Sequence, residues 1–70
     1  MNVEYDNKAD AAYLYLMPVT EGTVKKTYLC DPREVGGQIN LDFDAAGHLV
    51  GIEVLDASRL LPKVLLRTSS

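Results

Sequence analysis

Two alternating segments on either side of Asp44–Gly47 constrain the fold of this chain more than any other feature. Ile39, Leu41 and Phe43 alternate with polar residues before this tetrapeptide, and apolar residues at 50, 52 and 54 alternate after it. Because side chains of a strand point to opposite faces in turn, each segment predicts a half-buried strand. An Asp that bonds back to the chain and a Gly that adopts positive φ are typical of a turn. The sequence therefore predicts a β-hairpin with Asp44 and Gly47 as its structural turn residues.

The hydrophobic pattern also predicts the register of this hairpin. A four-residue loop would place Leu41 opposite Val50 and Ile39 opposite Ile52, with the apolar side chains on one side. A three-residue loop would set polar residues against apolar ones, and such a slip is costly where one face is buried. We therefore expect a four-residue loop, with Asp42 and Glu53 on the outer face.

The same stretch, DFDAAGHLVGIE, also matches the spacing of a twelve-residue calcium loop. Such a loop lies between helices, whereas both flanks here alternate as strands, and Ala46 and Val50 stand where oxygen ligands are needed. The pattern thus favours a turn, with no metal and no cofactor. One alternative stays open: Asp42, Asp44 and Glu53, with His48, would form the acidic site of a small hydrolase or metal-dependent enzyme.

The remaining segments complete a small α+β domain over residues 1–70. Strands are predicted at 1–5, 11–17 and 23–30, and residues 31–37 read as a loop or a single turn. From Leu55 to Ser70 the period changes to that of an amphipathic helix. Pro62 predicts either a tight turn with the helix starting there, or a kink. We expect an antiparallel meander of four or five strands with one C-terminal helix packed on one face.

Composition and charge narrow the class of protein. The net charge of −3 argues against a nucleic-acid partner, because such binding depends mainly on Lys and Arg. A single cysteine, Cys30, cannot form an intramolecular disulfide, and it reads as a small apolar residue rather than a nucleophile. With neither a signal peptide nor a membrane-spanning run visible, the expected location is the cytoplasm.

The second predicted strand is apolar on both faces. Tyr13, Tyr15 and Met17 alternate with Leu14 and Leu16, and one short helix can cover only one of these faces. A chain of 70 residues has a small core, which natural proteins often supplement by oligomerisation. The pattern predicts a homodimer through the uncovered face, with Tyr13, Tyr15 and Met17 as interface candidates.

Two stretches, YDNKADAAYLYL and INLDFDAAGHLVGIEVLDASRLL, resemble a prokaryotic family known as domain of unknown function 2283. The residues that match its pattern are Tyr5, Asp6, Asp10, Asp42, Asp44, Gly47, Gly51, Ile52, Glu53, Leu55, Asp56, Ala57 and Ser58. The resemblance implies a small sheet with a helix and no established activity. Some members are similar to proteins encoded beside small toxin-like partners. This implies a non-enzymatic protein-interaction module or an antitoxin-like partner.

Overall fold

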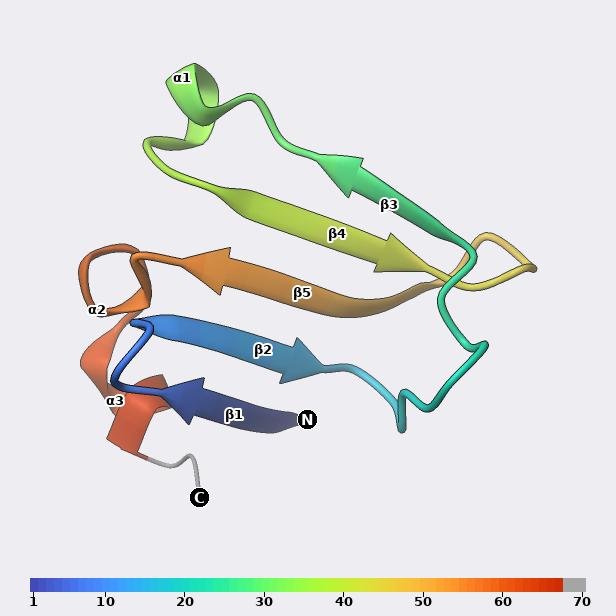
Figure 1. The fold of residues 1–70 in the computed structure, drawn as a ribbon, viewed down its shortest axis with the longest axis horizontal. Helices are drawn as coiled ribbons and strands as arrows, with labels where there is room; N and C mark the ends of the chain where they lie inside the picture. The colour runs from blue at the N-terminus through green and yellow to red at the C-terminus, as the bar shows by residue number, and fades with distance from the viewer. Residues whose placement is uncertain (68–70) are drawn as a thin grey trace.

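A five-stranded antiparallel sheet forms the body of the computed structural model, which describes residues 1–67 (Figure 1). The order across the sheet is β1-β2-β5-β4-β3. The strands are β1 (Asn2–Asp6), β2 (Ala11–Tyr15), β3 (Lys26–Leu29), β4 (Ile39–Phe43) and β5 (Leu49–Leu55). The α+β class and the antiparallel sheet agree with the prediction from sequence.

The sheet is not a simple meander, so that part of the prediction is wrong. β3, β4 and β5 follow one another, but β2 pairs with β5 instead of with β3. The connection over residues 16–25 therefore passes the ends of two strands (Figure 1). β5 becomes the central strand, and its Val50 and Val54 are the largest fully buried side chains.

The hairpin between β4 and β5 forms where the sequence places it, but the predicted register is wrong. The Asp44 amide donates to the His48 carbonyl at 3.0 Å, which leaves a loop of only three residues, and Gly47 has a φ of 87°. Val50 is then an extra residue on β5, since Asp42 faces Gly51 whereas Phe43 faces Leu49. This β-bulge moves the register by one further residue and again sets apolar residues opposite one another.

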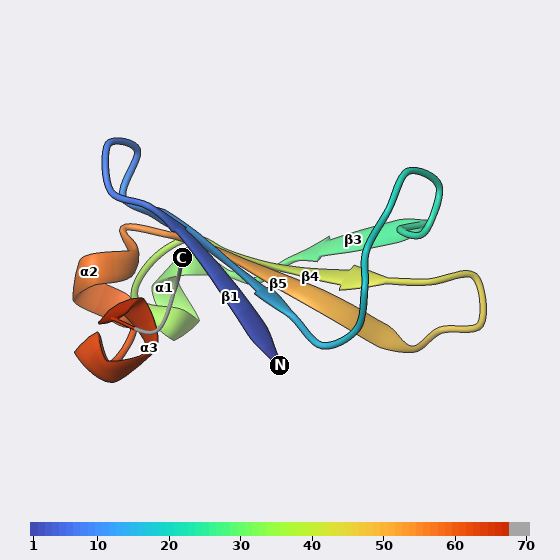
Figure 2. The same cartoon turned by 90° about the horizontal axis from the view of Figure 1, so that it is seen from below.

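The core lies on one face of the sheet. Val3, Ala12, Leu14 and Val54 form a buried cluster with Ala57, and five further apolar side chains together with Tyr5 pack against it: Ile39, Ile52, Leu60, Leu61 and Leu66. All three helical segments lie on this side of the sheet (Figure 2). We call the opposite side the helix-free face; by register it carries Asn2, Glu4, Asp6, Ala11, Tyr13, Tyr15, Thr27, Leu29, Asn40, Asp42, Gly51, Glu53 and Leu55.

The C-terminal segment forms two short helices instead of the single predicted one. They are α2 (Ala57–Leu60) and α3 (Lys63–Arg67), and they lie near one end of the sheet (Figures 1 and 2). Between them Leu61 is extended, with φ −102° and ψ 148°, because a following proline disfavours helical values. The part of the predicted helix at residues 68–70 lies outside the described residues. A further single turn, α1 (Pro32–Val35), is capped by Asp31.

Candidate functional site

Three strands share one hydrogen-bonded group on the helix-free face. Tyr13 of β2 reaches across β5 and donates to Asp42 Oδ2 of β4 at 2.5 Å. Thr27 of β3 donates to the other oxygen of the same carboxylate at 2.7 Å. The Asp42 carboxylate therefore links β2 and β3, which are not neighbours in the sheet.

Gly51 makes this crossing possible. It lies on β5 directly opposite Asp42, beneath the Tyr13 ring. A Cβ atom at this position would overlap the ring, at 2.5 Å from Cε1 and from Cζ. Only glycine lets the phenol lie flat over the central strand.

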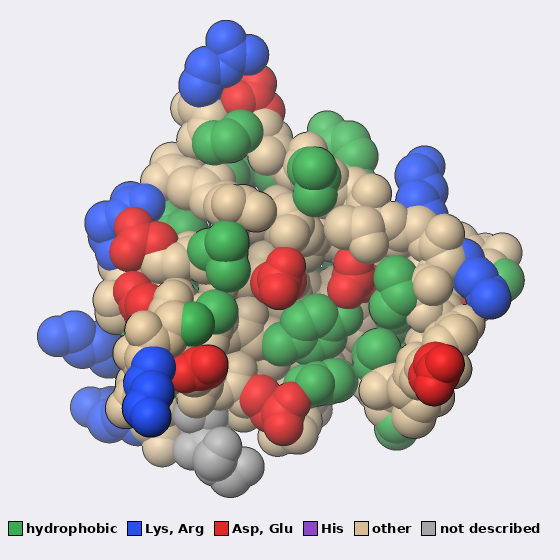
Figure 3. All heavy atoms as spheres, viewed as in Figure 1, with side chains coloured by type: hydrophobic (Ala, Val, Ile, Leu, Met, Phe, Trp, Pro, Cys, Tyr) green, Lys and Arg blue, Asp and Glu red, His purple; other side chains and the backbone are tan. Residues whose placement is uncertain are grey.

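Two further hydrogen-bonded pairs lie on this face. Asn40 donates to Glu53 Oε1 at 2.8 Å, and Tyr15 donates to Glu4 Oε1. The Tyr13 and Tyr15 rings are 4.7 Å apart between centroids, within the range of favourable aromatic pairs. Acidic side chains accordingly occupy the middle of this face among hydrophobic ones (Figure 3).

The two tyrosines act as hydrogen-bond donors. Burial, and then the bond to Asp42, raises the pKa of Tyr13, and the bond to Glu4 raises the pKa of Tyr15. Both phenols are protonated at neutral pH, because a raised pKa lies above the usual value of about 10. They can stabilise carboxylates or contact a partner, but they do not supply a phenolate base.

The structure does not bring the residues of the predicted acidic site together. Asp42 and Glu53 lie on the helix-free face, whereas Asp44 accepts hydrogen bonds from the amides of Ala46 and His48 within its own turn. His48 Nδ1 is 3.6 Å from the Asp44 carboxylate, and the imidazole is mostly exposed. Within residues 1–67, no three His, Cys, Asp or Glu side chains lie close enough together to hold a metal ion.

Cys30 lies at the end of β3, apart from these groups. Its amide donates to the Ile39 carbonyl at 3.0 Å, which continues the pairing of β3 with β4, and its thiol is free and half-buried. The chain's single histidine is in the β4–β5 turn, so a Cys–His pair is not assembled.

A second cluster, at Asp10, was not singled out as a site by sequence reasoning. The Asp10 carboxylate accepts from Tyr5 at 2.7 Å and from the Ser58 amide and hydroxyl at 2.9 and 2.8 Å. It thereby caps α2 from the β1–β2 turn, in place of Asp56, whose side chain makes no cap bond. The available signal was that Tyr5, Asp10 and Ser58 all belong to the family pattern.

This cluster predicts a specific acid dependence of stability. Hydrogen bonds from Tyr5 and Ser58 lower the pKa of Asp10. A carboxyl with a lowered folded-state pKa contributes stability above its unfolded pKa of about 3.9, and this contribution is lost as pH falls through the folded value. Denaturant titration should therefore show Asp10→Asn less stable than wild type near neutral pH, with the difference shrinking below about pH 4. Glu21→Gln is the control, and a difference independent of pH would contradict the assignment.

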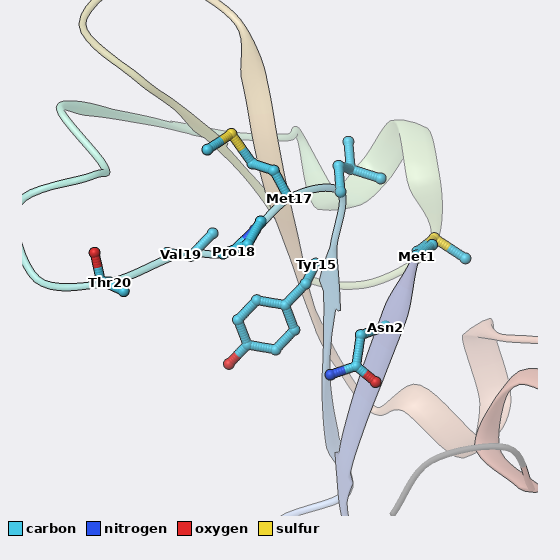
Figure 4. Close-up of a pocket in the computed structure, with 8 residues that line it drawn as sticks. Met1, Asn2, Tyr15, Met17, Pro18, Val19 and Thr20 are labelled. Atoms are coloured by element: carbon cyan, nitrogen blue, oxygen red, sulfur yellow. The ribbon is translucent and has the colours of Figure 1, made fainter.

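An open hollow lies where β2 ends beside the start of β1 (Figure 4). Its walls are partly apolar and well exposed: Leu16 is 43% exposed and Met17 44% exposed. The other lining residues are Met1, Asn2, Tyr15, Pro18, Val19 and Thr20. Tyr15 joins this hollow to the tyrosines and carboxylates of the helix-free face. Of the three predicted interface candidates, Tyr13 is thus held inside the hydrogen-bonded group, whereas Tyr15 and Met17 line the hollow.

These features define a small α+β domain with an antiparallel five-stranded sheet and one helix-free, acidic face. The chain belongs to the family described as Protein of unknown function (DUF2283), whose model matches residues 2–58. The expected family is therefore confirmed. Searches of curated proteins and of solved structures find no significant match. Among residues 1–67, no helix is long and apolar enough to cross a membrane.

Proposed function

We propose that this protein is a non-enzymatic protein-interaction module that binds a basic protein through its helix-free face. One observation carries the proposal: an exposed, partly apolar hollow opens beside a face on which the strands place four carboxylates and no lysine or arginine. The carboxylates belong to Glu4, Asp6, Asp42 and Glu53. Apolar anchors surrounded by charge of one sign are suited to a partner of the opposite sign.

The charge of this face favours one of two occupants. A second copy of the chain would bring the same carboxylates against one another, and like charges across an interface are costly. A basic partner would instead gain electrostatic attraction and could insert an apolar side chain into the hollow that Leu16 and Met17 help to line. The antitoxin-like role implied by the family resemblance fits such a partner, namely a small toxin-like protein. We therefore assign this face to a different protein.

The hydrogen bonds on the face favour binding over catalysis. Asp42 and Glu53 accept bonds from Tyr13, Thr27 and Asn40, and these bonds tie β2, β3, β4 and β5 together. A general base must instead be free to take a proton from a substrate within hydrogen-bond reach. The alternative of a small hydrolase or metal-dependent enzyme on this face has no arrangement of side chains in its favour within the described residues.

The test uses the small basic protein, if one is encoded beside this gene, as the titrant in calorimetry. Met17→Asp should weaken binding by roughly tenfold or more, because it places a charge in the apolar hollow. Val64→Asp is the matched control, since Val64 is 53% exposed on α3, at the helix side of the sheet. Equal loss with both variants, or unchanged binding with Met17→Asp, would rule out the helix-free face. Absence of binding at about 100 μM would count against this partner class.

A further inference from the structure

β3 is an edge strand with an open side. Within residues 1–67 it pairs only with β4, and all four of its residues are exposed. The Cys30 amide points to β4, where it donates to Ile39. Because amides alternate in direction along a strand, those of Thr27 and Leu29 point to the open side. An edge of this kind can accept another strand.

The side chains of this edge include two of the most exposed large apolar residues. Leu29 is 66% exposed and Tyr28 is 54% exposed. Lys25 and Lys26 precede them, and edge lysines normally prevent strand addition unless the incoming strand offers opposite charge. The occupant of this edge must therefore present apolar side chains near Tyr28 and an acidic one near the lysines.

We propose that the occupant is β3 of a second copy of this chain, paired antiparallel about a twofold axis that passes beside Tyr28. Thr27 of each copy then faces Leu29 of the other, and these residues exchange backbone hydrogen bonds. The two Tyr28 side chains lie next to each other. Thr27 and Leu29 lie on the helix-free face by register, but the contact is made by the outer backbone edge of β3 and does not depend on the basic partner.

Charge selects this register from its neighbours. With Thr27 opposite Leu29, Lys25 of each copy faces Asp31 of the other, which gives two pairs of opposite charge. A register in which Thr27 faces Thr27 of the second copy places Lys25 opposite Leu29. A shift that sets Leu29 against itself places Lys25 opposite Arg33. Of these three registers, only the proposed one brings opposite charges together.

The chain on either side of β3 leaves room for this pairing. α1 lies on the helix side of the sheet, whereas the residues before β3 rise on the opposite side (Figure 2). A twofold axis perpendicular to the sheet brings α1 of one copy toward the segment before β3 of the other, on opposite sides of the joined sheet. The same axis leaves both helix-free faces on one side.

The strength of this dimer is limited by its size and by Arg33. Four backbone hydrogen bonds and two tyrosines make a small contact, and small contacts are typical of weak complexes. The Asp31 carboxylate also bonds to Arg33 at 3.0 Å, which reduces its attraction for a second cation. We therefore expect dissociation in the range of about 10 μM to 1 mM.

Sedimentation equilibrium from about 10 μM to 2 mM tests the proposal. Wild type should shift from monomer to dimer in this range. Leu29→Pro should remain monomeric yet folded, because the lost amide points to the open side and proline is tolerated on edge strands. A wild-type chain that stays monomeric throughout would overturn the proposal.

Charge variants test the register. Lys25→Glu should weaken the dimer by roughly tenfold, since it faces Asp31 of the second copy, and Lys25→Glu/Asp31→Lys should recover most of the loss. Circular dichroism checks that each variant is folded, because Asp31 also caps α1. A dimer that persists in Leu29→Pro but is lost in Met17→Asp would overturn the edge pairing and place the dimer on the helix-free face. Binding of a basic protein would still be tested separately, by the calorimetric titration described above.

Discussion

Leu14→Ala should be among the most destabilising single substitutions in this protein. Leu14 is only 8% exposed, and it lies between Val3 and Ile52 on the helix side of the sheet. Truncating a buried leucine costs about 2 to 5 kcal/mol, from lost burial and from the cavity left behind. A domain of this length has a free energy of unfolding of about 3 to 10 kcal/mol. Urea denaturation should therefore show a large fall in the midpoint, or a chain already unfolded in buffer.

Leu16→Ala is the matched control for this prediction. Leu16 follows the end of β2, where its amide donates to the Val50 carbonyl at 3.0 Å, but its side chain is 43% exposed. The same atoms are removed from a partly exposed side chain, so the free energy of unfolding should fall by about 1 kcal/mol or less. Similar losses for the two variants would mean that the core does not lie under β2 as described.

The hairpin shows how far a periodic pattern can predict a fold. Alternation located both strands and identified Asp44 and Gly47 as turn residues. The register failed because Val50 enters as an extra residue, and two registers that differ by two residues put the same side chains on the same face. A period of two therefore cannot distinguish them, and a bulge adds no separate signal in a single sequence.

The C-terminal helices and the strand order illustrate two other limits. Pro62 predicts a break in the C-terminal helix. Both alternatives, a tight turn with the helix starting at Pro62 and a kink at Pro62, assume one main helix. The structure has two short ones, because Leu61 before the proline is extended. That β2 would pair with β5 follows from long-range packing, which local patterns of residues do not encode.

Parts of the candidate site were visible in the sequence, but their connections were not. Tyr13, Asp42 and Glu53 were each assigned to an outer face, with the tyrosine treated as an interface residue and the acids as an alternative site. The bond between Tyr13 and Asp42 spans β5, and it depends on the strand order and on the missing side chain of Gly51. The match of Gly51 and Asp42 to the family pattern was the signal that could have linked them.

Gly51→Ala should destabilise the protein although alanine is normally the better residue within a strand. Gly51 has no positive φ, so its backbone would accept alanine, and reduced freedom of the unfolded chain would favour it by about 0.5 to 1 kcal/mol. The added methyl would instead overlap the Tyr13 ring. Displacing the ring also breaks its bond to Asp42, and we expect a net loss of about 1 to 3 kcal/mol by urea denaturation.

A double-mutant cycle separates this cause from any general intolerance of position 51. In a Tyr13→Ala background the methyl meets no ring, so Gly51→Ala should become neutral or stabilising, and the coupling should be about 1 to 3 kcal/mol. In a Tyr13→Phe background the ring remains and only the hydroxyl is lost, so the cost of Gly51→Ala should largely persist. A cost of Gly51→Ala that is the same in all three backgrounds would show that Tyr13 does not lie over β5. It would also remove the link between β2 and β4 on which the geometry of the helix-free face depends.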